Sequence, residues 1–267
     1  MGEYGYVGGE PTQAAGSNSG IFQVNDVIEL IDLGKWTNPI ITANLEFYVD
    51  ASNPSSYSGS GTTWYDLSSN NYDLTLTNSP TYNSGLDAHF DFNGSNQYAI
   101  RSMGGATTNY TYFSVEVWVR TDGNTGSTYH GIYQYNADGT SGGGAPAIRT
   151  LTNSSTSKLD CHFYNTSNVV PTNAQIQSFS GLSTSNWTHV AYTYDQSKTR
   201  LYINGSLETT SGTVGAQTVD TFDGIYVGVG DGRYLNGDIA VVRHYSSTLS
   251  DSEIQSNYNA ERVRFGL

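Results

Sequence analysis

The sequence predicts an all-β protein in which two antiparallel sheets form one sandwich. Only 13% of the 267 residues are charged, and 30 Gly and 21 Tyr stand among many Ser, Thr and Asn. This composition favours strands and turns over helices, which prefer Ala, Leu, Glu and Lys. Alternating apolar and polar residues and a hairpin signal at Asn204-Gly205 indicate the same fold. A sandwich of this length commonly stands as one domain, so a single core is sufficient.

Residues 1–40 are predicted to form an N-terminal arm with a short docking helix. Residues 1 to about 20 are too polar to build a core. Apolar residues then follow helical spacing, with Asn25 as the N-cap and Gly34 at the end. A helix of about nine residues is unstable alone, so it must dock on the sandwich or on another protein. The predicted docking side chains are Ile21, Phe22, Val24, Val27, Ile28, Ile31 and Trp36.

Residues 41–267 are predicted to form the sandwich. The run NLEFYVDA alternates as a strand with one buried face, so the domain is expected to begin there. The clearest two-faced strand is TYFSVEVWVRT, in which four side chains share the face that is expected to be core: Phe113, Val115, Val117 and Val119.

The C-terminal part contains a predicted hairpin and a predicted short helix. Asn204-Gly205 suits a type I′ turn, which needs positive φ at both central residues. Ser250 followed by Glu253 is a capping box, and the preceding Leu249 can pack on Ile254 as a hydrophobic staple.

Charge and composition argue against several classes of partner. The formal net charge of −13 disfavours nucleic-acid binding, which needs clustered Lys and Arg. The single cysteine, Cys161, excludes an internal disulfide. No apolar run is long enough for membrane insertion, and the first residues do not resemble a signal peptide. We therefore expect the protein to be made and kept in a cytoplasm, or released by lysis.

Several segments resemble a known family. WTHVAYTYD, LYINGS, LNGDIAVVRHYSSTLSDSEI and the segment that begins LEFYVDASNPSSYSGSGTTWYDL are similar to concanavalin A-like (laminin-G-like) jelly-roll domains of tailed-phage virion proteins, particularly marine and cyanophage types. The resemblance covers about residues 43–267, and GEPTQAAGSNSGIFQVNDVIELIDLGKW resembles a short N-terminal element of phage structural proteins.

The resemblance implies an all-β jelly-roll sandwich displayed on a virion surface and assembled in the host cytoplasm. Because no repeat encodes a shaft, a capsid decoration or a compact neck or tail-appendage module is expected rather than a long fibre. The expected partners are other virion structural proteins, and particle symmetry favours a homo-oligomer such as a trimer.

Two alternative functions remain open, and both concern glycans. A carbohydrate-binding host-attachment protein would use aromatic and amide side chains, which one stretch supplies: Tyr129, Tyr133, Tyr135, Asn136 and Asp138. A glycan depolymerase is less favoured, because its relatives carry Glu-x-Asp-x-x-Glu on one strand, whereas this chain has Glu116 alone with Trp118 at the next matching position. Glu116 is expected to be solvated or paired with Arg120, and no catalytic residue is predicted.

No cofactor is required by any motif. The five His residues lack the spacing of a zinc site. Laminin-G-like domains often bind calcium at the rim, and rim-type loops here offer Asp122, Asn124 and Asp231, although none has the register of a dedicated calcium loop. Calcium is therefore an open option.

Overall fold

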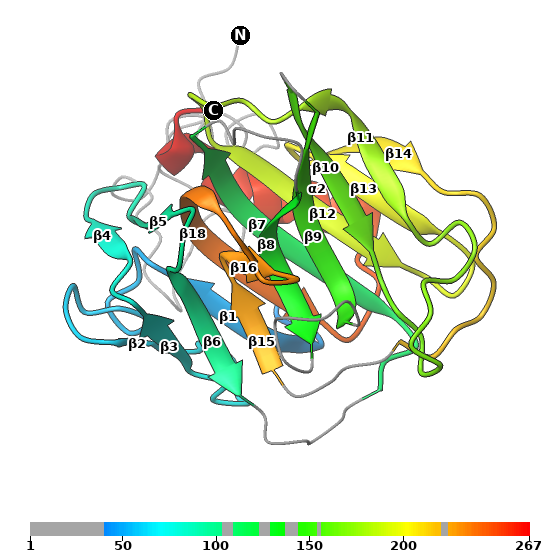
Figure 1. Ribbon diagram of the computed structural model, residues 1–267, viewed down its shortest axis with the longest axis horizontal. Coiled ribbons are helices and arrows are strands. Elements are labelled where there is room, and N and C mark those ends of the chain that lie inside the picture. Colours follow the sequence, from blue (N-terminus) through cyan, green and yellow to red (C-terminus); the bar gives the residue numbers. More distant parts are fainter. Residues whose placement is uncertain (1–39, 103–108, 123–128, 137–143, 154–155, 220–223) are drawn as a thin grey trace, which may run out of the picture.

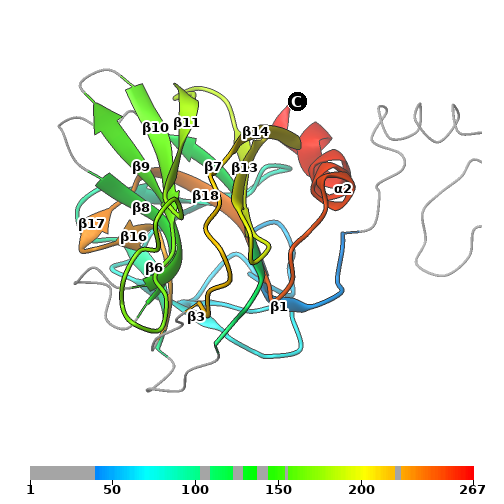
Figure 2. The ribbon, with the colours of Figure 1, turned by 90° about the vertical axis from the view of Figure 1, so that its right-hand side faces the viewer.

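The computed structural model describes residues 40–102, 109–122, 129–136, 144–153, 156–219 and 224–267. These residues form two stacked antiparallel sheets of eight strands each, with one α-helix outside the first sheet (Figures 1 and 2). The predicted all-β sandwich is confirmed. The predicted docking helix and its seven side chains from Ile21 to Trp36 lie outside the described residues.

In the first sheet, β18 pairs with three other strands. Its strand order is β14 (Ser206–Thr210), β13 (Thr199–Ile203), β12 (Thr188–Tyr194), β7 (Phe113–Thr121), β18 (Asn236–Tyr245), β5 (His89–Asn93) and β4 (Thr81–Asn83), with β1 (Leu45–Asp50) paired to the far end of β18.

The second sheet faces the first across the core. Its order is β11 (Ile176–Gly181), β10 (Thr156–His162), β9 (Gly144–Asn153), β8 (Tyr129–Asn136), β15 (Gly224–Val227), β6 (Tyr98–Ser102), β3 (Leu74–Thr77) and β2 (Thr63–Trp64). A small hairpin of β16 (Val229–Gly230) and β17 (Arg233–Tyr234) lies outside β8 (Figure 2).

Alternation along the strands places one set of side chains in the core. On β7 the predicted core face is confirmed, because its four apolar residues from Phe113 to Val119 are fully buried in the main cluster. Ile148 on β9 and Leu159 and Cys161 on β10 enter the same cluster from the second sheet. Burial of such side chains contributes about 25 cal/mol for each Å² of apolar surface removed from water.

The outer face of the first sheet is also buried, because the C-terminal helix α2 (Asp251–Glu261) and the 3-10 helix η1 (Arg262–Phe265) cover it. Figure 2 shows the three layers in order: second sheet, first sheet and α2. Trp118 of β7 stacks on Phe265 of η1, with 4.0 Å between their ring centroids. Strand β7 therefore has two buried faces.

The predicted turn and cap are confirmed. Asn204 and Gly205 have φ values of 49° and 73°, as a type I′ turn requires. A side chain at 205 would lie 2.8 Å from Tyr258 on α2, so glycine also allows the hairpin to pack against the helix. Ser250 and Glu253 form the capping box.

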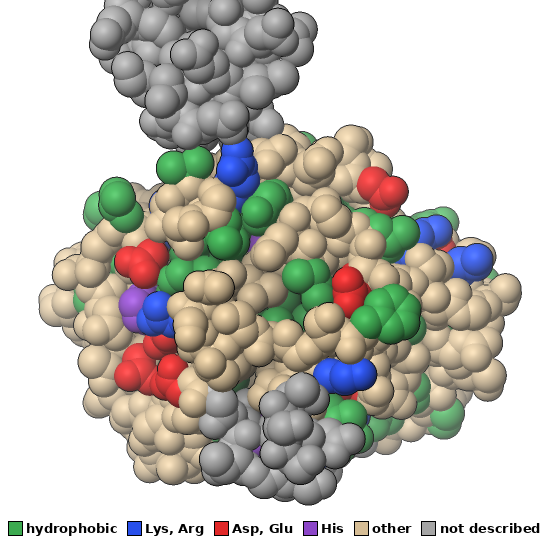
Figure 3. Space-filling model, turned by 90° about the horizontal axis from the view of Figure 1, so that it is seen from above, with side chains coloured by type: hydrophobic (Ala, Val, Ile, Leu, Met, Phe, Trp, Pro, Cys, Tyr) green, Lys and Arg blue, Asp and Glu red, His purple; other side chains and the backbone are tan. Residues whose placement is uncertain are grey.

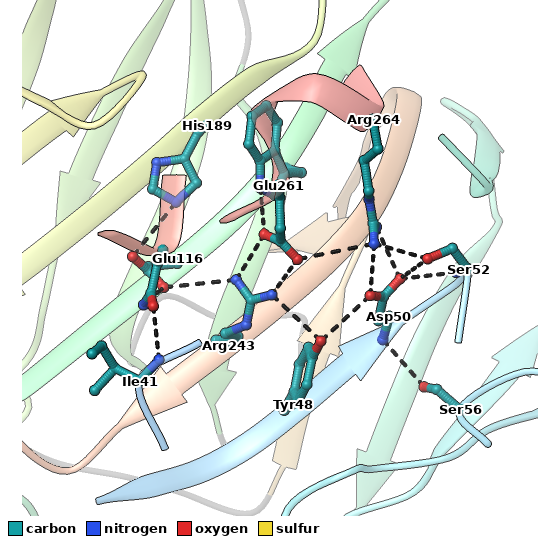
Figure 4. Close-up of polar contacts among 12 residues, drawn as sticks. Ile41, Tyr48, Asp50, Ser52, Ser56, Glu116, His189, Arg243, Glu261 and Arg264 are labelled. Atoms are coloured by element: carbon teal, nitrogen blue, oxygen red, sulfur yellow. Dashed lines mark hydrogen bonds and ion pairs between the residues drawn. The ribbon is translucent and has the colours of Figure 1, made fainter. Parts of the chain in front are cut away.

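A buried polar network attaches the end of α2 to the first sheet (Figure 4). Arg243 of β18 is fully buried, and its Nη1 donates to Glu261 Oε2 at 3.0 Å while its Nη2 donates to Glu261 Oε1. Trp118 Nε1 donates to the same carboxylate at 2.7 Å. Burial opposes the charge of Arg243, but the adjacent Glu261 outweighs burial and raises the pKa of the guanidinium.

Two further carboxylates extend this network. Glu116 on β7 accepts a hydrogen bond from Asn257 of α2 at 2.8 Å, and it lies 3.9 Å from Arg243 Nη1. At the other side, Arg264 of η1 donates to both oxygens of Asp50 on β1 at 2.8 and 2.9 Å. Strands β1, β7 and β18 are thereby joined to the C-terminal segment.

Loss of the Glu261 charge should destabilise the fold. We expect Glu261→Gln to lower the free energy of unfolding by about 3 kcal/mol, because it leaves Arg243 buried without its main counter-charge. Urea unfolding at neutral pH would measure the change. Glu253→Gln on the same helix is the control, since glutamine can also complete a capping box. Equal stability of the two variants would contradict the assigned role of Glu261.

Candidate functional site

The outer face of the second sheet holds a polar cluster that neither helix of the described residues covers. Strands β8 to β11 contribute most of it, and the β16–β17 hairpin borders it (Figure 1). We call this cluster the Arg149 patch, and it comprises Tyr129, Arg149, Asp160, Tyr164, Gln175, Gln177 and Asp231.

Arg149 on β9 is the centre of the patch. Its Nε donates to Asp160 Oδ1 at 2.9 Å, and its Nη1 donates to Asp231 Oδ2 at 3.0 Å. Its guanidinium carbon lies 3.7 Å from the centroid of the Tyr129 ring. One cation therefore joins two strands and the hairpin tip, and its charge is already balanced by two carboxylates.

Strand alternation places Asp160 on the outer face of β10. Leu159 and Cys161 point into the core, so Asp160 points outward, directly opposite Arg149 and Gln177 in the register. Gln175 Nε2 and Gln177 Nε2 donate to Asp160 Oδ2 at 2.7 and 2.8 Å.

Burial of Asp160 opposes its ionisation. However, the neighbouring His162, the two glutamines and the charge of Arg149 together outweigh burial and hold the pKa of the carboxyl well below its ordinary value. Asp160 is therefore a fixed anion that orients two exposed amides. Within the described part of the chain, each amide uses one N–H in this way, which leaves its carbonyl oxygen and its second N–H for another partner.

The β16–β17 hairpin packs directly on β8 because residue 131 is glycine. A Cβ at Gly131 would lie 1.9 Å from the backbone nitrogen of Gly230, so no other residue allows this approach. Gln134 Oε1 accepts the backbone N–H of Asp231 at 3.1 Å. The hairpin tip is thus held where Asp231 can reach Arg149.

Aromatic rings lie at two sides of the patch. Tyr129 is half-buried, and the guanidinium of Arg149 lies over its ring. Tyr164 is also half-buried and packs edge-on against His162, with 5.5 Å between the ring centroids. Amides, carboxylates and partly exposed aromatic rings are the groups that bind sugar hydroxyls and sugar faces.

The structure separates the predicted aromatic cluster. Tyr129 faces outward, but Tyr133 and Tyr135 are 0% and 2% exposed and belong to the core. A bulge between Gly131 and Tyr133 causes this difference, because one extra residue moves the following side chains to the opposite face. In this conformation neither ring can contact a sugar, which corrects the sequence-based assignment. Asp138 and the side chain of Asn136 lie outside the described residues.

Tyr133 instead contacts a buried histidine. Its hydroxyl lies 2.8 Å from Nδ1 of His244 on β18, across the core. Burial lowers the pKa of His244 to about 3, so the imidazole is neutral at physiological pH. This pair satisfies a phenol that would otherwise be buried without a partner.

The predicted calcium residues do not form a cluster in the described structure. Asp122 is exposed after the end of β7, Asp231 is paired with Arg149, and Asn124 lies outside the described residues. No group of three or more His, Cys, Asp or Glu suited to a metal ion occurs among the residues that the structure describes.

Glu116 is not accessible to a substrate in this structure. It is 1% exposed and lies beneath α2, with His189 Nε2 3.5 Å from its Oε1 (Figure 4). The expectation that it is solvated or paired with Arg120 is wrong, because Glu116 faces Arg243 while Arg120 Nε donates to Asp238 at 2.7 Å. The helix that covers Glu116 was not anticipated as a second buried layer.

Arg149, Asp160 and the two glutamines were not among the site residues predicted from the sequence. A signal was present in LDCHFY, where polar Asp160 and His162 alternate with apolar residues. That alternation predicts an outward-facing carboxylate. Its partners come from β9 and β11, so the cluster depends on strand pairing that local spacing does not specify.

The upper edge of the sandwich, seen in Figure 3, shows mostly uncharged polar side chains and backbone, with charged side chains widely scattered. Within the described ranges, no helix is long and apolar enough to cross a membrane.

Comparison with known proteins gives one family match. Residues 92–255, more than half of the chain, match the family described as "Concanavalin A-like lectin/glucanases superfamily". No curated protein matches the chain in sequence.

Solved structures with a similar fold include domains of bacterial proteins. The receptor binding domain of botulinum neurotoxin C/D mosaic serotype is 14% identical with a TM-score of 0.62, over 83% of this chain and 52% of that chain. The serotype D ligand binding domain in complex with N-acetylneuraminic acid gives the same values. The chain thus spans about half the length of these toxin domains.

A third structure is matched over its whole length. Domain 4 of AbnA, an extracellular arabinanase from Geobacillus stearothermophilus, in complex with arabinotriose, is 19% identical with a TM-score of 0.58. The match covers 82% of this chain and 100% of that one. At such low identities, the likenesses show a shared fold.

The pKa of Asp160 predicts a pH-dependent contribution to stability. Because it is lower in the folded than in the unfolded protein, the ionised carboxylate stabilises the fold above its unfolded pKa of about 3.9, and this contribution is lost as the pH falls toward the folded pKa. We expect Asp160→Asn to cost about 2 kcal/mol at pH 7.

Urea unfolding of the wild type and Asp160→Asn at neutral and acidic pH would test this expectation. The difference between them should shrink as the pH falls below the unfolded pKa. Asp122→Asn removes an exposed carboxylate and serves as the control. A difference for Asp160→Asn that stays constant with pH would contradict the prediction.

Proposed function

Because the chain belongs to the concanavalin A-like lectin/glucanases superfamily, we propose that it is a non-catalytic carbohydrate-binding protein whose sugar site is the Arg149 patch. The observation that carries the proposal is the pair of exposed amides, Gln175 and Gln177, fixed by one buried carboxylate. Side chains held before binding lose less conformational entropy when a ligand orders them.

The patch also offers rigidly held groups that suit a sugar. It lies on the outside of strands, which hold side chains more rigidly than loops do. Tyr164 can provide an apolar ring face beside these amides, and Asp231 can accept hydrogen bonds from hydroxyls. The N-acetylneuraminic acid and arabinotriose complexes of the similar structures agree with a sugar ligand.

The electrostatics of the patch favour binding over glycoside hydrolysis. A glycosidase needs one carboxyl group that is protonated at working pH, so that it can donate a proton to the leaving oxygen. Asp160 is held ionised, and both it and Asp231 are paired with Arg149. We therefore propose no catalytic role for either carboxylate.

A glycan array would test the proposed function directly. We expect the wild type to bind a subset of glycans and Gln177→Ala to lose at least about fivefold in affinity, because it removes one fixed hydrogen-bonding amide. Gln255→Ala, an exposed glutamine on α2, is the matched control. If no glycan binds, or if both variants bind like the wild type, the patch is not a sugar site.

We further propose that the sandwich is displayed on the exterior of a tailed-phage particle, as a capsid decoration or a compact neck or tail appendage. The support is the resemblance of residues 43–267 and of the N-terminal segment to phage structural proteins. Other virion proteins and further copies of this chain, for example in a trimer, are then the partners, and a host surface glycan is the ligand.

The virion proposal predicts separate roles for the two parts of the chain. Deletion of residues 1–36 should leave a folded sandwich that no longer enters particles, because the predicted docking side chains are removed. Circular dichroism would establish folding, and immunoblotting of purified particles would measure incorporation. Normal incorporation of the truncated protein would contradict the docking role.

A further inference from the structure

Three of the few cations of this strongly acidic protein lie in or beside the Arg149 patch. The chain carries only 11 Lys and Arg and a formal net charge of −13. Two of these cations, Lys158 and Arg233, lie beside the patch in addition to Arg149 itself. Lys158 is on β10, and Arg233 is on β17 of the hairpin that packs on β8.

The two cations lie at opposite ends of one row of residues. In the register of the sheet, Tyr129 is opposite Leu151, and Leu151 is opposite Lys158. Adjacent strands are about 4.8 Å apart, so Lys158 stands roughly 10 Å from Tyr129 across the sheet. On the other side, the guanidinium carbon of Arg233 lies 5.7 Å from the Tyr129 ring centroid.

All four side chains of this row can be reached by a ligand. Tyr129, Leu151 and Lys158 are half-buried, and Arg233 is exposed. The adjacent row of the sheet holds Arg149, Asp160 and Gln177, and Asp231 of the hairpin turn is paired with Arg149 beside it. The surface therefore has a row with two cations beside a row of fixed hydrogen-bonding groups.

Lys158 and Arg233 differ from most arginines of the described structure in having free charge. Arg149 is neutralised by two carboxylates. Ion pairs with carboxylates also occur at four other arginines: Arg120, Arg200, Arg243 and Arg264. Among the described residues, neither Lys158 nor Arg233 has an ion-pair partner. Unpaired cations beside a binding surface favour an anionic ligand.

We infer that the ligand of the Arg149 patch is a glycan that carries carboxylate groups, an inference that rests on the proposed sugar-binding function. The sugar backbone lies over Tyr129 and Leu151, and Gln177 bonds its hydroxyls. Arg233 takes one carboxylate with its planar fork of donors, and Lys158 takes another as a point charge. Arg149 acts as a positioning residue, because Asp160 and Asp231 already neutralise its charge.

The test compares each acidic glycan with its neutral counterpart. The probes are oligosaccharides that contain galacturonate, glucuronate or N-acetylneuraminate, each presented beside its methyl ester, together with neutral arabinan and glucan fragments. Bound glycans should carry free carboxylates, and esterification should weaken binding at least about tenfold, as expected when two exposed ion pairs are lost together.

Substitution of Arg233 and Lys158 tests whether these two cations cause the preference for acidic glycans. Arg233→Gln and Lys158→Gln should each weaken binding of the acidic glycan about threefold, and the double variant about tenfold, without changing binding of the ester. Lys198→Gln removes the same charge from the distant β12–β13 turn and should have no effect.

The outcomes separate this inference from the proposed function. If the protein binds neutral glycans, or binds acids and esters equally, the carboxylate preference is overturned. The sugar site itself stands in that case, provided that Gln177→Ala still weakens binding. An acid preference that survives in the double variant would overturn the assignment to Lys158 and Arg233. Absence of binding to every probe would overturn both proposals.

Discussion

The buried ion pair between Arg243 and Glu261 determines which face of the sandwich remains open. It fixes the last turn of α2 to β18, and Trp118 and Phe265 complete the contact with apolar surface. Because breaking one partner of a buried pair leaves an uncompensated charge, the helix is strongly held in this position. The central strands of the first sheet are consequently buried on both faces, and among the described residues only the second sheet has a polar outer face without a covering helix.

Arginine has a different role on that second surface. The Arg149 side chain is 15% exposed and its partner Asp231 is 16% exposed, so water screens this pair more than the buried one. Its main contribution is geometric, because it fixes Tyr129, Asp160 and the hairpin tip relative to one another. The close approach of the hairpin in turn depends on Gly131, which has no side chain to obstruct Gly230.

The sequence predicted those features that depend on local rules. The turn at Asn204-Gly205, the capping box at Ser250 and the core face of β7 each follow from a few neighbouring residues. The alternative site at Tyr133 and Tyr135 failed because a bulge in β8 changes which face these residues occupy. Gly131, which directly precedes the bulge, was its only local sign. The partner of Glu116 was missed because β18 and α2 approach β7 only in the folded protein.

The central claim is that sugars bind on the outer face of the second sheet, at groups organised by Arg149. A crystal structure with a bound oligosaccharide tests it most directly. We expect a sugar over strands β8 to β11, with hydroxyl contacts to Gln177 and a ring beside Tyr129. A sugar bound at the loops of the rim or over α2, with the Arg149 patch free, would contradict the account.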